Sequence, residues 1–246
     1  MLKVHKKVGQ TPLDVIDEIR RDNPKLKGEP MSYAGRLDPM AEGEMLILVG
    51  EDENRRRTEF LEFDKEYEAD ILIGCATDTY DALGIVTDYK DGAVTPAQQK
   101  KIRTLISAFT KKKTQVYPEF SSKTVQGKPL FEWKKSGRIH EIKLPKRSIA
   151  IRKAKLLALE TITVKELHSY IHSTVPLVRG DFRQKEILET WDKTLSALNI
   201  EYFIVARVLF HVSSGTYIRG LANELGKKLK IPACLLRLKR TKILSE

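Results

Sequence analysis

One acidic residue lies on a short segment whose neighbours restrict its backbone, GRLDPMAEG at residues 35–43. Pro39 fixes its own φ and favours extended geometry at Asp38, while Gly35 and Gly43 are expected to allow tight turns on either side. A carboxylate held in this way can act as a nucleophile or as a general acid or base. The alternative is a structural aspartate that begins a turn or caps a helix.

Five other segments carry residue types that often form sites. They are 65–69 (KEYEA), 74–84 (GCATDTYDALG), 115–137 (with QVYP, S, K, G, LFE and G), 213–222 (SSGTYIRGLA) and 236–241 (LRLKRT). Together with GRLDPMAEG, and in this order, they resemble the TruB family of tRNA pseudouridine synthases. A single motif is weak evidence for the family, because G-R-L-D also opens the active-site segment of other pseudouridine synthase families. Six motifs in register are specific, and they extend from about residue 7 to residue 241.

The resemblance implies three catalytic residues. Asp38 matches the catalytic aspartate, and Arg219 matches the arginine that pairs with it in a forked geometry. Tyr67 matches the tyrosine that stacks on the target base and takes part in proton removal from C5. Without the resemblance, Tyr67 could fill the core and Arg219 could begin a helix that faces solvent.

The resemblance also implies the substrate, which is uridine 55 in the T-loop of tRNA, flipped out of the RNA into the enzyme. Asp81 matches a loop residue that contacts flipped nucleotides, and Leu238 matches an apolar residue that packs near the target base. We expect Tyr217 to bind substrate too, although its ring could instead only pack against the fold. No metal and no organic cofactor is expected, because the isomerisation involves no net redox change and no hydrolysis.

Three features depart from the family pattern. Tyr33 stands where the family usually has a histidine that assists base flipping, so we expect Tyr33 to stack on a base instead. The chain ends at Glu246 and is expected to lack the C-terminal RNA-binding domain of many members, so that residues 1–246 form one catalytic domain. Residues 163–198 are longer than the usual connection and carry a heptad-like apolar pattern, which predicts a helical insertion that covers the sheet or clasps RNA or a protein.

Two other functions have to be weighed. A catalytically silent RNA-binding or tRNA-folding protein with the same fold would not need Asp38, Tyr67 and Arg219 together. A carboxylate-using glycosidase would need a second acid opposite Asp38, and the motifs supply an arginine instead. The sequence does not decide whether Asp38 attacks the sugar or the base.

The charge balance favours a polyanionic partner. Lys and Arg number 44 against 33 acidic residues, which gives a net charge of +11. The basic clusters at 55–57, 111–113, 134–135 and 237–242 could line a phosphate track, although the sequence does not say whether they converge.

Metal and membrane binding are not expected. Cys75 and Cys234 lack metal-ligand spacing, and both are expected to be reduced. His168 and His172 are four residues apart, but no acid or cysteine near them in the sequence completes a zinc site, so a solvent-facing pair is favoured. The carboxylates of Asp78 and Asp81 are expected to bond their own backbone rather than a divalent metal. With no signal peptide and no apolar stretch long enough to span a bilayer, we expect a cytoplasmic monomer.

The periodicity predicts the elements that hold these residues. Threonine–proline pairs at 11–12 and 95–96 mark helix starts, and a third helix is expected at 220–230. Strands are expected at 45–49, 66–73, 85–88, 138–144, 148–163 and 202–212, with a polar loop at 74–84. Because helices and strands do not alternate regularly, an α+β fold around a central mixed, mainly antiparallel sheet flanked by helices is predicted.

Overall fold

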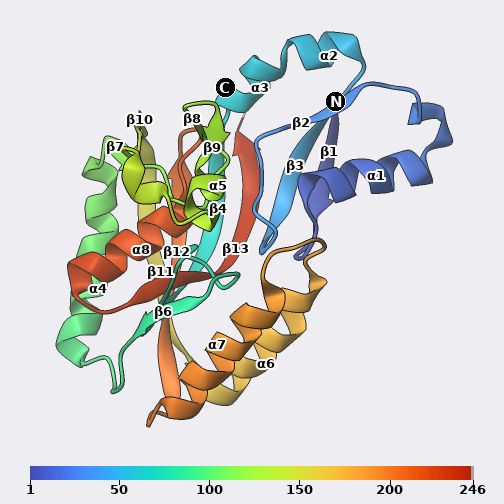
Figure 1. Cartoon of the computed structure of the whole chain (residues 1–246). Helices are drawn as coiled ribbons and strands as arrows, with labels where there is room; N and C mark the ends of the chain where they lie inside the picture. Colours follow the sequence, from blue (N-terminus) through green and yellow to red (C-terminus); the bar gives the residue numbers. More distant parts are fainter. Residues whose placement is uncertain (245–246) are drawn as a thin grey trace.

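The fold is built on one mixed sheet of seven strands, which the computed structural model describes within residues 1–244 (Figure 1). Six strands follow the order β1-β3-β13-β4-β12-β11, and β2 pairs with β3. The strands are β1 (Leu2–Lys6), β2 (Met31–Ala34), β3 (Ala41–Val49), β4 (Asp64–Ile73), β11 (Ile151–Thr163), β12 (Tyr202–Val212) and β13 (Ala233–Leu244). The β13–β3 pair is parallel and the other pairs of this sheet are antiparallel. The predicted fold class is confirmed.

Helices cover both faces of this sheet because its strands are apolar on both sides. Ile71 of β4 packs in one cluster with α4 (Pro96–Ala108) and α8 (Ile218–Leu229), whereas its neighbour Leu72 packs with α6 (Val164–Thr174) and α7 (Gln184–Ala197). Successive side chains of a strand point to opposite faces, so the two helix pairs lie on opposite sides. The helices predicted within 163–198 therefore cover one face of the sheet.

The strands β1 to β3 carry their own helices. Val15 and Ile16 of α1 (Pro12–Asp22) pack on Met45 and Ile47 of β3, and Phe60 of α3 (Arg57–Glu62) lies in a separate cluster with Leu46 and Leu48. The remaining helices are α2 (Glu51–Arg55), α3 (Arg57–Glu62), α5 (Leu130–Lys135) and the 3₁₀ turns η1 (Pro24–Leu26), η2 (Phe109–Lys111), η3 (Ile139–Glu141) and η4 (Val175–Leu177). Small antiparallel pairs join β5 (Cys75–Thr77) to β6 (Val86–Tyr89), β7 (Thr114–Val116) to β10 (Lys146–Ser148) and β8 (Thr124–Val125) to β9 (Lys128–Pro129).

Threonine capping boxes begin α1, α4 and α6. In each, the threonine hydroxyl accepts from the N3 backbone N–H, and the N3 side chain accepts from the threonine N–H. The helix starts predicted at Thr11 and Thr95 are thereby confirmed. Helix α8 begins at Ile218, two residues before the predicted start, and this places Arg219 inside its first turn.

Three local predictions are wrong. Residues 138–144 contain no strand, because Ile139 and Ile142 lie on one side of the turn η3 and pack with Trp133. The polar loop predicted from residue 74 is shorter, since β5 continues as far as Thr77. Gly43 lies inside β3 rather than in a turn, and it is needed because a Cβ there would lie 2.1 Å from the backbone oxygen of Arg240 on β13.

No helix within residues 1–244 is both long enough and apolar enough to cross a membrane.

Candidate active site

Asp38 lies on the loop between β2 and β3, three residues before β3 begins. The loop is fixed at both sides of Asp38: Leu37 is buried in the main core, and the carbonyl of Pro39 accepts from the Gly9 N–H at 2.9 Å. Lys6, which is fully buried, donates from Nζ to the carbonyls of Lys7 and Gln10 and, at 3.4 Å, of Pro39. Burial lowers the pKa of Lys6 to about 8. The carboxylate of Asp38 is 36% exposed, so it can be reached from the cavity.

Arg219 holds that carboxylate from the N-terminus of α8. Its Nε donates to Oδ2 of Asp38 at 2.9 Å, although 181 residues separate the two. Its Nη1 donates to the carbonyl of Thr79 at 2.8 Å, and its Nη2 donates to the carbonyl of Phe120 at 2.9 Å. Arg219 is buried, so the solvent-facing alternative does not apply. One guanidinium therefore fixes three loops around Asp38.

Tyr67 lies on β4 beside the same cavity. Its ring is buried in the main core, and its hydroxyl oxygen accepts from Nε of Arg240 at 3.1 Å. Arg240 is itself buried on β13 and also donates to the carbonyls of Gly35, Arg36 and Glu44. Tyr67 and the loop of Asp38 thus both accept hydrogen bonds from the same arginine. From the sequence, Arg240 was placed in the motif at 236–241 and in a basic cluster, but no role was assigned to it.

The four predicted substrate-binding residues lie around this cavity, which has a volume of about 730 Å³. Tyr33 and Leu238 are half-buried in its wall, and so is Tyr217. Gln115 holds the backbone of Tyr217 from both sides, donating to its carbonyl and accepting from its N–H, each at 2.9 Å. The cavity therefore brings together all seven residues singled out from the sequence, with Asp38, Tyr67, Arg219 and Asp81 among its lining.

Asp81 is buried at the edge of the cavity. Its Oδ1 accepts from the Thr79 hydroxyl at 2.8 Å and from the Leu83 N–H at 3.1 Å. Asp78 accepts from the Ile85 N–H, so both carboxylates bond their own loop as expected. Burial raises the pKa of Asp81 to about 6, against a lowering effect of Arg219.

The raised pKa of Asp81 has a consequence for stability. Between pH about 4 and 6 the folded protein binds a proton at Asp81 that the unfolded chain does not bind, so this group contributes stability that is lost as pH rises through that window. We expect the free energy of unfolding of the wild type, relative to Asp81→Asn, to fall by on the order of 2–3 kcal/mol between pH 4 and pH 6.5. Urea unfolding at several pH values measures this difference. A difference that stays constant across the window contradicts the assignment.

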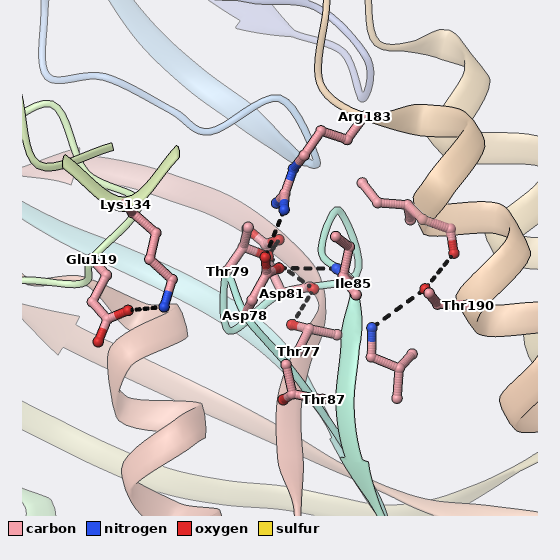
Figure 2. Close-up of polar contacts among 12 residues, drawn as sticks. Thr77, Asp78, Thr79, Asp81, Ile85, Thr87, Glu119, Lys134, Arg183 and Thr190 are labelled. Carbon is pink, nitrogen blue, oxygen red and sulfur yellow. Dashed lines mark hydrogen bonds and ion pairs between the residues drawn. The ribbon is translucent and has the colours of Figure 1, made fainter. Parts of the chain in front are cut away.

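One cavity residue that the sequence did not single out, Arg183, is joined to the Asp78 loop (Figure 2). Arg183 reaches down from the connection between η4 and α7, and its Nη1 donates to Oδ2 of Asp78 at 2.7 Å across 105 residues. Its guanidinium carbon lies 4.6 Å from the ring centre of Phe120. A positive φ at Arg183 could not be read from the sequence, and neither could a contact between such distant residues.

Few members of the basic clusters line the cavity. Within residues 1–244, Lys135 and Arg240 are the cluster members that line the cavity, and its other cations include Arg36, Lys65, Arg147 and Arg183. Several cluster members pair with local acids instead: Arg55 with Glu51, Arg56 with Glu59, Lys112 with Glu224, Lys134 with Glu119, and Arg237 with Asp70. Burial lowers the pKa of Lys65 to about 8.

Among the described residues, one group of side chains has the chemistry of a metal site, and it lies outside this cavity. It consists of His168 and His172 on α6 and Asp192 on α7. The expectation that no acid completes a site with the histidine pair is wrong, because α7 brings Asp192 to it from twenty residues away. Both histidines are exposed, as expected.

Comparison with known proteins agrees with the motifs. Residues 24–174 match the model of "TruB family pseudouridylate synthase (N terminal domain)". The chain is 30% identical to tRNA pseudouridine synthase B of Bacillus licheniformis and 31% identical to that of Protochlamydia amoebophila, in each case over 98% of its own length. It spans 64% of the first relative's length and 73% of the second's.

Among solved structures, the chain is similar to one titled "Crystal Structure of a Cbf5-Nop10-Gar1 Complex", with a TM-score of 0.54. The identity is 18%, and the match covers 97% of this chain and 47% of the other. This likeness concerns the fold.

Proposed function

The chain belongs to the TruB family of pseudouridylate synthases, and from that membership we propose that it converts a uridine in the T-loop of tRNA, at position 55, into pseudouridine. One observation carries the proposal: the Asp38 carboxylate is held by Arg219 at 2.9 Å in the wall of a cavity that Tyr67 also lines. The volume of about 730 Å³ is in the range that holds a nucleotide-sized ligand.

The reaction breaks the bond between ribose C1′ and N1 of uracil, turns the base, and joins C1′ to C5. The proton on C5 then leaves, and N1 gains one, so there is no net redox change and no hydrolysis. Asp38 acts as the nucleophile, on the sugar or on the base, or as the base that deprotonates the sugar. All three routes need an ionised carboxylate, which the fixed charge of Arg219 favours. No metal or organic cofactor takes part.

Tyr67 contributes an aromatic face to the bound base and assists removal of the C5 proton. Its hydroxyl oxygen accepts a hydrogen bond from Arg240, which fixes the ring beside the loop of Asp38. The phenol proton is not used in that hydrogen bond, so it remains available for exchange with substrate or solvent.

The substrate has to be extruded from the RNA into the cavity, which costs a few kcal/mol. Tyr33 and Tyr217 supply rings on which bases stack, and Leu238 packs beside the target base. Asp81 contacts the flipped nucleotide from its loop. The cavity cations Arg147 and Arg183 are suited to bind the phosphates that flank the extruded uridine.

One assay tests the proposal directly. The purified protein is incubated with an unmodified tRNA transcript, and pseudouridine is mapped by carbodiimide treatment and primer extension. We expect one stop at position 55 of the T-loop, and none in a transcript with cytidine at that position. A protein that binds the transcript but forms no pseudouridine would contradict the proposal and favour a silent RNA-binding or tRNA-folding role.

A further inference from the structure

Two histidines and one aspartate form a compact cluster on the outer surface of α6 and α7. The rings of His168 and His172 are stacked, with their centres 4.3 Å apart and an angle of 26° between their planes. Nε2 of His168 lies 3.1 Å from Oδ1 of Asp192, and Nε2 of His172 lies 2.7 Å from the same oxygen. Three possible ligand atoms from two helices are thus directed at one point.

The spacing of these atoms suits a tetrahedral ion. All three lie within 4.8 Å of one another. With zinc–nitrogen and zinc–oxygen distances of about 2.0–2.2 Å, the ligand atoms of a tetrahedral site are roughly 3.3 Å apart. The observed nitrogen–oxygen distances of 3.1 and 2.7 Å therefore need to lengthen by roughly 0.2 and 0.6 Å to admit an ion.

The cluster stands on a rigid base. Each of its residues directly follows a fully buried apolar residue: His168 follows Leu167, His172 follows Ile171, and Asp192 follows Trp191. These buried side chains belong to the cluster that packs α6 and α7 on the sheet. Because the buried neighbours fix the rotation of both helices, the ligand side chains start from fixed positions.

From this geometry we propose that His168, His172 and Asp192 form a zinc-binding site that joins α6 to α7. Neutral imidazole nitrogen and carboxylate oxygen are common zinc ligands. Two neutral histidines and one aspartate make a ligand set of net charge −1, which attracts a dication. The side chains are 49%, 37% and 45% exposed, so an ion can enter from solvent and water can fill the fourth position.

Binding changes the hydrogen bonding of the cluster. Each imidazole has Nε2 beside the carboxylate oxygen, and a neutral ring binds zinc through Nε2 in the tautomer that carries its single proton on Nδ1. The affinity therefore falls on acidification, because protonated histidine cannot ligate. The ion would restrict movement between the two helices, whose connection carries Arg183 into the cavity.

Isothermal titration of the untagged protein with zinc chloride tests the site without reference to catalysis. We expect one zinc per chain in the wild type. His168→Ala, His172→Ala and Asp192→Asn should each weaken binding at least tenfold. His5→Ala is the matched control, because His5 is also an exposed histidine beside a carboxylate, 3.5 Å from Glu42, and it should leave the affinity unchanged.

A second measurement separates loss of the site from loss of the fold. Zinc should raise the unfolding temperature of the wild type and of His5→Ala but not of the three site variants, while all five proteins should have similar circular dichroism spectra without zinc. The visible spectrum of the Co²⁺-loaded wild type should indicate tetrahedral coordination, and Asp192→Asn should lack it. The proposal is overturned if the wild type binds zinc no more tightly than the site variants, or if His5→Ala loses binding as they do.

Discussion

Asp38→Asn should abolish pseudouridine formation while the protein still folds and binds tRNA. Asparagine has the shape of aspartate and can still accept from Nε of Arg219 through its amide oxygen, but it has no charge to attack with or to accept a proton. We expect single-turnover rates to fall by at least about a thousandfold, as they do when an enzyme loses its reacting group. Because every proposed route needs the carboxylate, the prediction does not depend on whether Asp38 reacts with sugar or base.

The matched control is Glu62→Gln. Glu62 is an exposed acid that lines the same cavity, so its replacement removes the same unit of charge without touching Arg219. Rapid-quench assays with labelled tRNA measure the rate, and filter binding measures the affinity. Near wild-type turnover by Asp38→Asn would show that Asp38 is structural.

Arg219→Lys should also be strongly impaired, although the positive charge is kept. The guanidinium makes three hydrogen bonds in three directions, to Asp38, Thr79 and Phe120, and a lysine ammonium at the end of a flexible chain cannot reproduce them together. Losing two hydrogen bonds of a buried charged group costs about 1.5–3 kcal/mol each. If most of that cost falls on the reacting geometry, the single-turnover rate drops about 100-fold or more.

Arg36→Lys provides the comparison for this variant. Arg36 lines the cavity too, but it is exposed and its side chain makes one hydrogen bond, to the hydroxyl of Tyr33. The variant Arg36→Lys should therefore retain most of the wild-type single-turnover rate. Circular dichroism should show that Arg36→Lys and Arg219→Lys are both folded. Normal single-turnover rates in Arg219→Lys would contradict the proposal that Arg219 orients Asp38.

Much of this site could be predicted from the sequence because its residues lie in short motifs with specific spacing. Asp38, Tyr67 and Arg219 were identified in this way, and the structure brings them to one cavity. The first residues of α1 and α4 were predictable for a different reason. Threonine followed by proline determines a helix start through contacts within four residues.

The residues that escaped prediction act through contacts between distant segments. Arg183 reaches Asp78 across 105 residues, and Arg240 meets Tyr67 across 173, so neither partner can be read from local sequence. The turn η3 was mistaken for a strand because Ile139 and Ile142 are apolar at a spacing of three, which is compatible with a 3₁₀ turn as well as with an irregular strand. Asp192 was not predicted as a partner of the histidine pair, because it lies on another helix, twenty residues from His172.

The position of β13 affects when the sheet and its cavity can form during synthesis. This strand is the last one described, yet it lies between β3 and β4 in the middle of the sheet (Figure 1). Until it is made, β1 to β3 have no partner in the rest of the sheet, and Asp38 and Tyr67 belong to two unconnected pieces. Pairs such as Arg240 with Glu44, which are 196 residues apart, form late because closing such long loops is entropically slow. A nascent chain would therefore bring Asp38 and Tyr67 to one cavity only after β13 has left the ribosome and inserted between β3 and β4.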